Sequence, residues 1–371
     1  MAYVAVKGGQ EAIEASLQLL DYQKIAAGDF LQIEAIEANM GLLVDQVMSE
    51  SSLFAPNLAA RALWQAEGSV EEAVFLLRAY RSTLERLGYT QVIDTADEMF
   101  VERRISAAFK DIPEGQMLGA SYDYLHRLID FSTATDHTQY VENLRQLFTS
   151  ETLESELILT YPKVSDYLRE IGLLPKHSVN DTKPEDVTKK IMTFPTKRSE
   201  RLQSLTRGMS QALMAFAYSI IRGYGSIHPT VGELRVGKVP LYYQAPAQER
   251  AEEDCYYLGE IKVTEAEMFI PVVSKKAGQN VLEIEIGYGM VYGRNETKAI
   301  SMGILDYSLE VGDKSVPTGD EEFVLYHIDG IEATGFLSHL KLPHYVTFQS
   351  KLDSIRKTHH PKGALQNEAV L

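Results

Sequence analysis

The strongest constraint on the fold is a change of hydrophobic periodicity along the chain. Over residues 10–87, apolar side chains recur at helical spacing, as in Leu42, Leu43 and Val47, which predicts a set of helices. After Gly223, short alternating segments lie between glycines, as at 256–270 and 281–293, which predicts strands. Helices first and strands later are typical of the α+β class. We therefore predict a helical N-terminal half and a mixed C-terminal half with a β-sheet and flanking helices.

The length of 371 residues is enough for two domains or one elaborate one. We divide the chain into a helical region 1–131, a variable helical and loop excursion 132–195, and a mixed region 196–371. We also predict three helical segments. The basic run 102–111 and residues 122–131 are read as helical, and one helix is expected from about Ser199 to Arg222. Ser69 and Glu72 fit a capping box at the start of an earlier helix.

Charge and cysteine content exclude several classes of protein. The formal charge of −16 argues against a nucleic-acid partner, since such binding neutralises phosphates over a broad surface, but it leaves room for one anion in a local basic pocket. Cys255 is the single cysteine, so neither an internal disulfide nor a multi-cysteine zinc site is expected, and the composition fits a cytoplasmic protein. No secretion signal and no membrane span are expected, because the apolar stretches are short.

A glycine-rich stretch lies between a strand-like segment and a helix that we expect to start near Asn295. Such a turn can present backbone amides to phosphate. The glycines at 287, 289 and 293 match neither G-x-G-x-x-G nor the P-loop, so an ordinary set of bulge or hairpin glycines is the other interpretation.

Residues 218–237 place Arg222, His228 and Glu233 within one glycine-containing stretch. An arginine, a histidine and a carboxylate can hold an anion and move a proton. The alternative is a surface loop whose histidine precedes a proline for turn geometry. Arg103 and Arg104 stand out as basic positions in an acidic chain, because clustered guanidinium groups bind phosphate oxygens. A solvated helix face with acidic neighbours explains these basic positions equally well. The same two interpretations apply to a second basic set, Lys197, Arg198, Arg201 and Arg207.

His339 and His344 form the strongest chemical pattern, with a proline directly before the second histidine. Proline interrupts a helix, so a bend there can direct both rings to one metal ion. Zinc takes four ligands in a structural site and three plus water in a catalytic one, so two histidines alone are incomplete. A chance pair near a helix end is the alternative.

Four parts of the chain carry a family resemblance: residues 1–9 with 76–84, 102–119 with 122–131, 217–237, and 320–349. They resemble the PhnI family, the I subunits of the bacterial carbon–phosphorus lyase core complex. The resemblance implies a phosphonate-degrading system with G, H, J, K and L subunits as partners. With G, H and L, such a subunit replaces the purine of ATP by an alkylphosphonate at ribose C1′, giving ribose 1-phosphonate 5-triphosphate and adenine.

The resemblance also implies that the isolated subunit is a purine nucleosidase acting on ATP or GTP. His339 and His344 fall on two family histidines that help to bind zinc at the interface with the J subunit. The family's catalytic residues cannot be transferred in this way. By chemical type we take Glu233 and His228 as the hypothetical carboxylate and acid, with Arg222, Arg103 and Arg104 for the triphosphate. The alternatives are a scaffold subunit that completes its neighbours' sites, and a free-standing zinc hydrolase.

Overall fold

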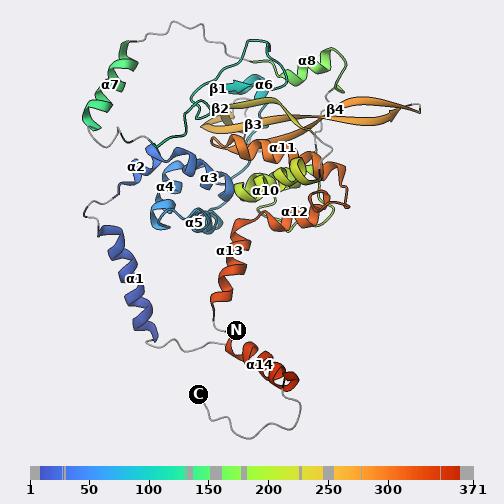
Figure 1. The fold of residues 1–371 in the computed structure, drawn as a ribbon. Helices are drawn as coiled ribbons and strands as arrows, with labels where there is room; N and C mark the ends of the chain where they lie inside the picture. Colours follow the sequence, from blue (N-terminus) through green and yellow to red (C-terminus); the bar gives the residue numbers. More distant parts are fainter. Residues whose placement is uncertain are drawn as a thin grey trace.

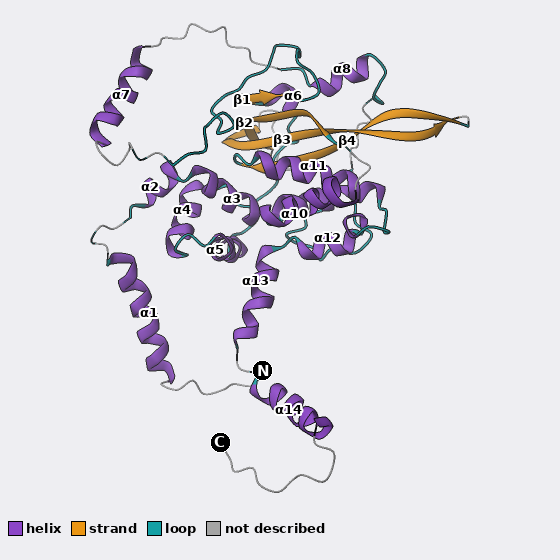
Figure 2. Cartoon of the chain, in the orientation of Figure 1, coloured by secondary structure: helices purple, strands orange, loops and turns teal. Residues whose placement is uncertain are grey.

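The computed structural model describes residues 9–26, 28, 31–129, 131, 137–150, 161–176, 182–224, 228–244, 255–276, 278–342 and 344–359. Its centre is an antiparallel sheet in the order β1-β2-β3-β4. The strands span Phe100–Ile105, Thr230–Gln244, Cys255–Lys276 and Gln279–Tyr292. Three of the four come from the C-terminal half, with helices before and beside them, which confirms the α+β prediction (Figure 2).

One face of the sheet is apolar and packs against helices. Leu234 of β2 and Ala266, Met268 and Ile270 of β3 point into the main core. The helices beside them are α9 (Arg198–Arg207), α10 (Ser210–Ser219), α11 (Glu296–Val311) and α12 (Glu321–His327). In Figure 1, α10 and α11 run beneath the sheet, whereas α6 and α8 lie above it.

Two glycines allow α11 to approach β4 closely. A Cβ atom at Gly287 would lie 2.0 Å from the carbonyl oxygen of Gly303, and one at Gly289 would lie 2.0 Å from that of Ala299. Both glycines lie within β4, so they serve helix-to-strand packing there. Asn295 caps α11 as expected, because its side chain accepts a hydrogen bond of 3.0 Å from the Lys298 amide.

The N-terminal helices form a separate core. Ser69 accepts a hydrogen bond from the Glu72 amide at 3.4 Å, which confirms the predicted N-cap. The helices of this core are α2 (Ile33–Asn39), α3 (Gly41–Ser51), α4 (Pro56–Gln65) and α5 (Val70–Ser82). Helix α1 (Gly9–Ile25) precedes them and has no buried residue. The set of helices predicted over residues 10–87 is therefore confirmed for its described part.

Three local predictions are wrong. Arg103 and Arg104 lie in β1 and not in a helix, because β1 pairs with β2, and residues 122–129 form turns and irregular backbone. The single helix over 199–222 is interrupted between α9 and α10, where the Met209 amide donates to the Ile328 carbonyl at 2.7 Å. A π-helical turn, Ile220–Tyr224, follows α10.

The predicted excursion 132–195 contains two helices among its described residues, α7 (His137–Ser150) and α8 (Val164–Glu170). A short helix, α6 (Thr95–Glu98), precedes β1. The three-region division stays a prediction, and the β1–β2 pairing joins its first and third regions.

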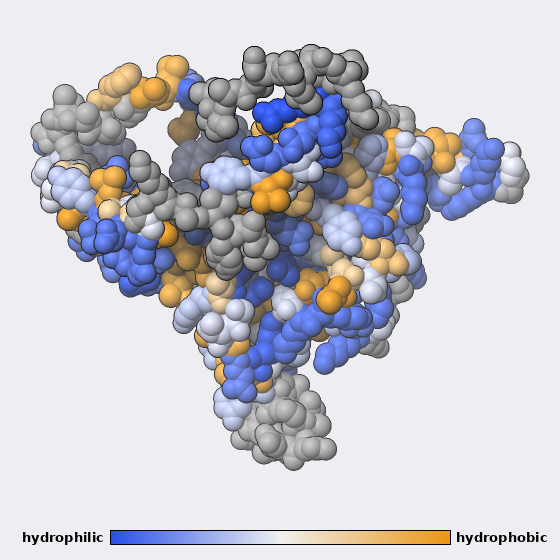
Figure 3. Space-filling model, turned by 90° about the horizontal axis from the view of Figure 1, so that it is seen from below, coloured by the Kyte–Doolittle hydropathy of each residue, from blue (hydrophilic) through white to orange (hydrophobic). Residues whose placement is uncertain are grey.

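The C-terminal helices leave the body of the molecule. Helix α13 (Gly330–Ser338) starts against α5, continues through a 3-10 turn (His339–Lys341), and is followed by α14 (Tyr345–His359). Figure 1 shows α13 and α14 extending downward, and α1 also extends downward, apart from them at the left. From below, polar and apolar side chains are intermixed over this face (Figure 3). Among the described residues, no helix has the length and apolarity needed to cross a membrane.

Candidate functional site

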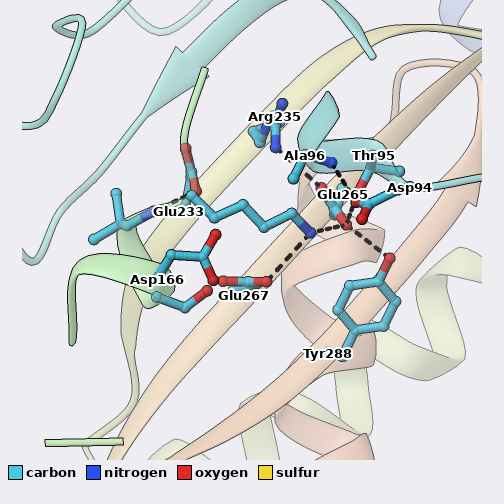
Figure 4. A network of polar contacts seen from close by, with 12 residues as sticks. Asp94, Thr95, Ala96, Asp166, Glu233, Arg235, Glu265, Glu267 and Tyr288 are labelled. Atoms are coloured by element: carbon cyan, nitrogen blue, oxygen red, sulfur yellow. Dashed lines mark hydrogen bonds and ion pairs between the residues drawn. The ribbon is translucent and has the colours of Figure 1, made fainter. Parts of the chain in front are cut away.

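The face of the sheet opposite the helical core carries a buried group of polar side chains, which we call the sheet-face cluster (Figure 4). The register explains the grouping, since Arg235 of β2 is opposite Glu265 of β3, and Glu233 is opposite Glu267. Its members are Glu233, Arg235, Glu265, Glu267, Tyr288 of β4, Thr95 of α6, Arg104 of β1 and Lys163, which directly precedes α8.

Glu265 Oε1 is the most heavily bonded atom of the cluster. It accepts hydrogen bonds of 2.8 Å from each of three donors, the Lys163 ammonium, the Thr95 hydroxyl and the Tyr288 hydroxyl. Burial acts to raise the pKa of Glu265, but Lys163, Arg235 and Tyr288 together outweigh it and hold that pKa below its usual range. Glu265 is therefore kept ionised.

Glu267 is the opposite case on the same strand. Its Oε1 lies 3.4 Å from the Lys163 ammonium, a weaker contact than that of Glu265. Burial raises the pKa of Glu267, and the neighbouring Glu265 carboxylate adds to the rise. The two carboxyl groups therefore have pKa values shifted in opposite directions.

Arg235 is buried without hydrogen bonds among the described residues. It is 1% exposed, and all three of its guanidinium nitrogens lack a partner there. Its Nη1 lies 4.0 Å from Glu265 Oε2, which is beyond hydrogen-bond distance. Glu265 Oε2 is also unpartnered, and Glu267 Oε2 has no partner of good hydrogen-bond geometry, although the Ser165 hydroxyl lies close enough to Glu267 to lower its pKa. Buried polar atoms are rarely left in this state, so the cluster lacks a partner that these atoms would bind.

The predicted residues Glu233 and Arg104 are brought together at one edge of the cluster. Arg104 Nε donates to Glu233 Oε1 at 2.5 Å, and the Val164 amide donates to Glu233 Oε2 at 3.0 Å. The other Arg104 nitrogens donate to the carbonyls of Pro113, Gly115 and Pro162. Both side chains are almost fully buried and already satisfied by the protein.

The remaining predicted residues lie elsewhere. Arg103 is buried and paired with Asp123 at 2.5 Å and with Glu296 at 3.0 Å. Arg222 is exposed on the π-helical turn, and His228 is exposed just before β2. The structure therefore joins Glu233 to Arg104 but leaves Arg222 and His228 outside the buried cluster.

Sequence reasoning missed most of the sheet-face cluster. The alternation of Glu265 and Glu267 in a strand was a usable signal, because alternate residues share one face. Their pairing with Arg235 depends on the strand register, and Lys163 comes from a region without periodicity. Neither the contact with Arg235 nor the contact with Lys163 can be predicted from the order of the residues.

His339 and His344 lie together where the chain leaves α13. Their ring centroids are 5.6 Å apart. The Nδ1 of His339 is hydrogen-bonded to the Phe336 carbonyl, and the Nδ1 of His344 to the Leu342 carbonyl at 2.5 Å. These bonds leave Nε2 of each ring for a metal, an orientation typical of zinc-bound histidines. Within the described part of the chain, no group of three or more His, Cys, Asp or Glu side chains is placed to hold a metal.

Comparison with known proteins gives one consistent result. The sequence profile of the PhnI family, described as "Bacterial phosphonate metabolism protein", matches residues 2–362. The chain is 42% identical over 378 residues to "Alpha-D-ribose 1-methylphosphonate 5-triphosphate synthase subunit PhnI" of Rhizobium meliloti (strain 1021), covering 98% of this chain and 96% of that protein. It is 41% identical over 361 residues to the Escherichia coli (strain K12) protein of the same name, covering 96% and 98%. The chain therefore belongs to the PhnI family of bacterial phosphonate metabolism proteins.

Proposed function

We propose that this chain is a cytoplasmic subunit of a carbon–phosphorus lyase system, acting with G, H, J, K and L partner subunits. Two relatives covering nearly the whole chain are named synthase subunits. In the proposed reaction, with G, H and L, an alkylphosphonate displaces the purine of ATP at ribose C1′ and adenine leaves. Without partners, the chain acts as a nucleosidase on ATP or GTP.

The observation that best supports a partner-dependent role is the exposed C-terminal arm, residues 336–348. Its apolar side chains are Phe336, Leu337, Leu340, Leu342, Tyr345, Val346 and Phe348, each at least 59% exposed. Contiguous apolar side chains on a soluble surface mark a place where another protein binds. The histidine pair lies within this arm, so a partner that covers the arm also reaches the histidines.

Zinc is the metal that we propose for this pair. Nitrogen ligands suit zinc, and the two rings, with centroids 5.6 Å apart, are the residues that would hold it. Because two histidines leave the coordination incomplete, the remaining ligands come from the partner that covers the arm. Bound there, zinc would supply a Lewis-acidic centre at the interface, while His339 and His344 fix its position.

The base-displacement step needs two kinds of group from the protein. Positive charge builds on the ribose as the N-glycosidic bond breaks, so a carboxylate near the sugar and an acid near the purine both help. Glu233 and His228 remain our proposed pair, with Arg222, Arg103 and Arg104 for the triphosphate. Arg222 is the best supported of these arginines, because Arg103 and Arg104 are already bonded within the protein.

A nucleotide assay tests the enzymatic proposal. Purified chain is incubated with ATP or GTP and free base is measured, first alone and then with methylphosphonate and the G, H and L subunits. Glu233→Gln is expected to stop adenine release while nucleotide still binds, and Arg222→Ala to raise the KM for ATP. Adenine release by Glu233→Gln at the parent rate would rule out that role for Glu233.

A scaffold role is the second candidate. It is favoured by the internal pairing of Arg103, Arg104 and Glu233, whose charged groups already pair with groups of the protein itself. Base release by the chain alone contradicts a pure scaffold. Metal analysis tests the shared site: the assembled complex should hold zinc that His339→Ala removes. If the isolated chain retains one full equivalent of zinc, and the His339→Ala variant retains it too, the shared zinc site is refuted.

A further inference from the structure

The unpartnered atoms of the sheet-face cluster indicate which hydrogen-bonding groups a ligand bound there would need. Arg235 offers five N–H donors and no acceptor. Glu265 Oε2 is an acceptor without a donor, and Glu267 Oε2 is an acceptor without a donor of good geometry. The 4.0 Å gap between Arg235 Nη1 and Glu265 Oε2 is too long for a direct bond. The missing partner must therefore accept from the guanidinium and donate to a carboxylate.

This requirement separates the classes of small ligand. A fully ionised phosphate can accept from Arg235, but it brings negative charge next to two carboxylate oxygens and donates nothing to them. A metal ion suits the carboxylates but is repelled by the guanidinium. A hydroxyl group is both a donor and an acceptor, so it satisfies both sides. Among metabolites, a sugar provides several hydroxyls on one rigid ring.

The charge balance of the cluster agrees with a neutral ligand. Three carboxylates, Glu233, Glu265 and Glu267, lie with three cationic side chains, Arg104, Lys163 and Arg235. A ligand without net charge leaves this balance intact. Glu265, held ionised by its three donors, would then face the sugar and stabilise positive charge that develops on the ring.

We propose that the sheet-face cluster binds the ribose hydroxyls of the nucleotide, with Arg235 donating to them and Glu265 and Glu267 accepting from them. This inference rests on the proposed function, because that function supplies a ribose. It adds Arg235, Glu265 and Glu267 as residues that bind the ribose, beside Glu233, which remains the proposed carboxylate of the reaction.

The proposal also implies movement of the segment that covers the cluster. Lys163 and the Val164 amide belong to this segment and bond to Glu265 and Glu233. The cluster is buried beneath it, so a ribose reaches Arg235 only when residues 161–176 shift from the sheet. Binding of ATP should therefore change amide hydrogen exchange in residues 161–176.

The test compares ATP with 2′-deoxy-ATP and 3′-deoxy-ATP in the complex of full-length chain with its G, H and L partners. A site built to bind a hydroxyl rejects the analogue that lacks it. At least one deoxy analogue should show a kcat/KM about 10- to 100-fold lower than ATP, the range for a hydrogen bond to a charged group. In Arg235→Lys, which keeps the charge but loses the planar donor geometry, this preference should fall to within about threefold.

Arg78→Lys is the matched control. Arg78 forms another partly buried ion pair, 2.6 Å from Asp329, away from the cluster. A general loss of stability would lower activity toward all three nucleotides in both variants, whereas only Arg235→Lys should change the ratio between them.

The outcomes are distinguishable. Adenine release from ATP with equal use of the deoxy analogues, or an unchanged preference in Arg235→Lys, overturns the ribose site and leaves the proposed function intact. Absence of adenine release from ATP in the complete assembly overturns both. If Arg235→Lys does not fold, amide hydrogen exchange in the parent protein is the deciding measurement. The change that ATP causes at residues 161–176 should be smaller with the deoxy analogue that has the lower kcat/KM. An equal change with all three nucleotides means that the cluster holds only water.

Discussion

The two faces of the central sheet are buried in different ways. Toward the helices, β3 contributes Ala266, Met268 and Ile270 to an apolar core. Toward α6 and α8, the same strand contributes Glu265 and Glu267 to a charged cluster (Figure 4). Burial of apolar groups is favourable without specific partners, whereas buried charges need partners at defined distances. Alternation of polar and apolar residues along a strand therefore assigns side chains to two faces of the sheet. It does not show that the polar face is exposed to solvent.

Buried charge also distinguishes the two sides. On the helical side, Lys298 of α11 is buried and donates to two neutral acceptors, Ser49 Oγ at 3.0 Å and the Thr206 carbonyl at 2.7 Å, with the Glu50 carboxylate as an opposite charge nearby. On the cluster side, positive and negative groups compensate one another. The comparison therefore predicts different responses to substitution and to pH.

The largest effect is expected from Arg104→Met. This change leaves Glu233 buried without its counter-ion, which costs about 3–5 kcal/mol of unfolding free energy. Denaturant unfolding at neutral pH measures the loss. The double variant Arg104→Met, Glu233→Gln should recover part of it, and Arg222→Met on the exposed turn serves as the control. A loss below about 1 kcal/mol would show that the pair is not buried as described.

The next effect concerns Lys298 on the helical side. Burial lowers the pKa of Lys298 to about 8, from 10.5. Between these values the unfolded chain holds a proton that the folded chain has released, so stability rises with pH across this window, by up to about 3 kcal/mol. Unfolding free energies are measured for the parent protein and Lys298→Met from pH 8 to 10.5. The free energy of the parent should rise relative to that of Lys298→Met by this amount. Parallel curves would contradict the lowered pKa.

A smaller effect is expected from Tyr288→Phe, which removes one donor from the ionised Glu265. Such a bond contributes about 1.5–3 kcal/mol. Because the pKa of Glu265 is lowered in the folded state, its stabilisation is present above the unfolded pKa of about 4.5 and is lost as pH falls through the folded value. The difference between the parent protein and Tyr288→Phe should therefore shrink in acid. Equal differences at pH 7 and at a pH low enough to protonate Glu265 in the folded protein would argue against an ionised Glu265.

The smallest effect is expected on the apolar face of the same strand. Ile270→Val deletes one buried methylene and should cost about 0.5–1.5 kcal/mol. The deleted methylene carries no charge and forms no hydrogen bond, so the loss should change much less with pH than that of Tyr288→Phe. A loss that followed the acid response of Tyr288→Phe would mean that the two faces are not independent.

Local patterns were sufficient for many elements. Helical spacing and the Ser69 cap predicted the N-terminal helices, and alternation with glycine punctuation predicted the strands. The same reasoning failed for residues 102–111, because β1 owes its conformation to pairing with β2 and not to its own pattern. It also failed at residues 208–209, where a long-range bond to Ile328 accompanies the break between α9 and α10.

In the candidate site, too, some features follow from local sequence patterns and others only from the tertiary structure. The histidine pair was visible in the sequence because both residues lie on one short stretch, and the family resemblance pointed to it. Glu233 and Arg104 were each selected for chemical type, but their contact with one another was not foreseen. Arg235 lies in the glycine-containing stretch 218–237 but is not among the predicted site residues, and its unpartnered guanidinium is visible only in the folded structure.

By itself, the sequence determined the α+β class, the helical and strand-bearing parts, the family and the two histidines, since these depend on residue type and short-range spacing. Tertiary structure alone decided which charges are buried and which groups they meet. The register of β2 on β3 places Arg235 opposite Glu265, and the segment before α8 brings Lys163 across more than a hundred residues of chain. Burial and partner distance set the charge state of such groups, and neither quantity is a property of a residue's position along the chain.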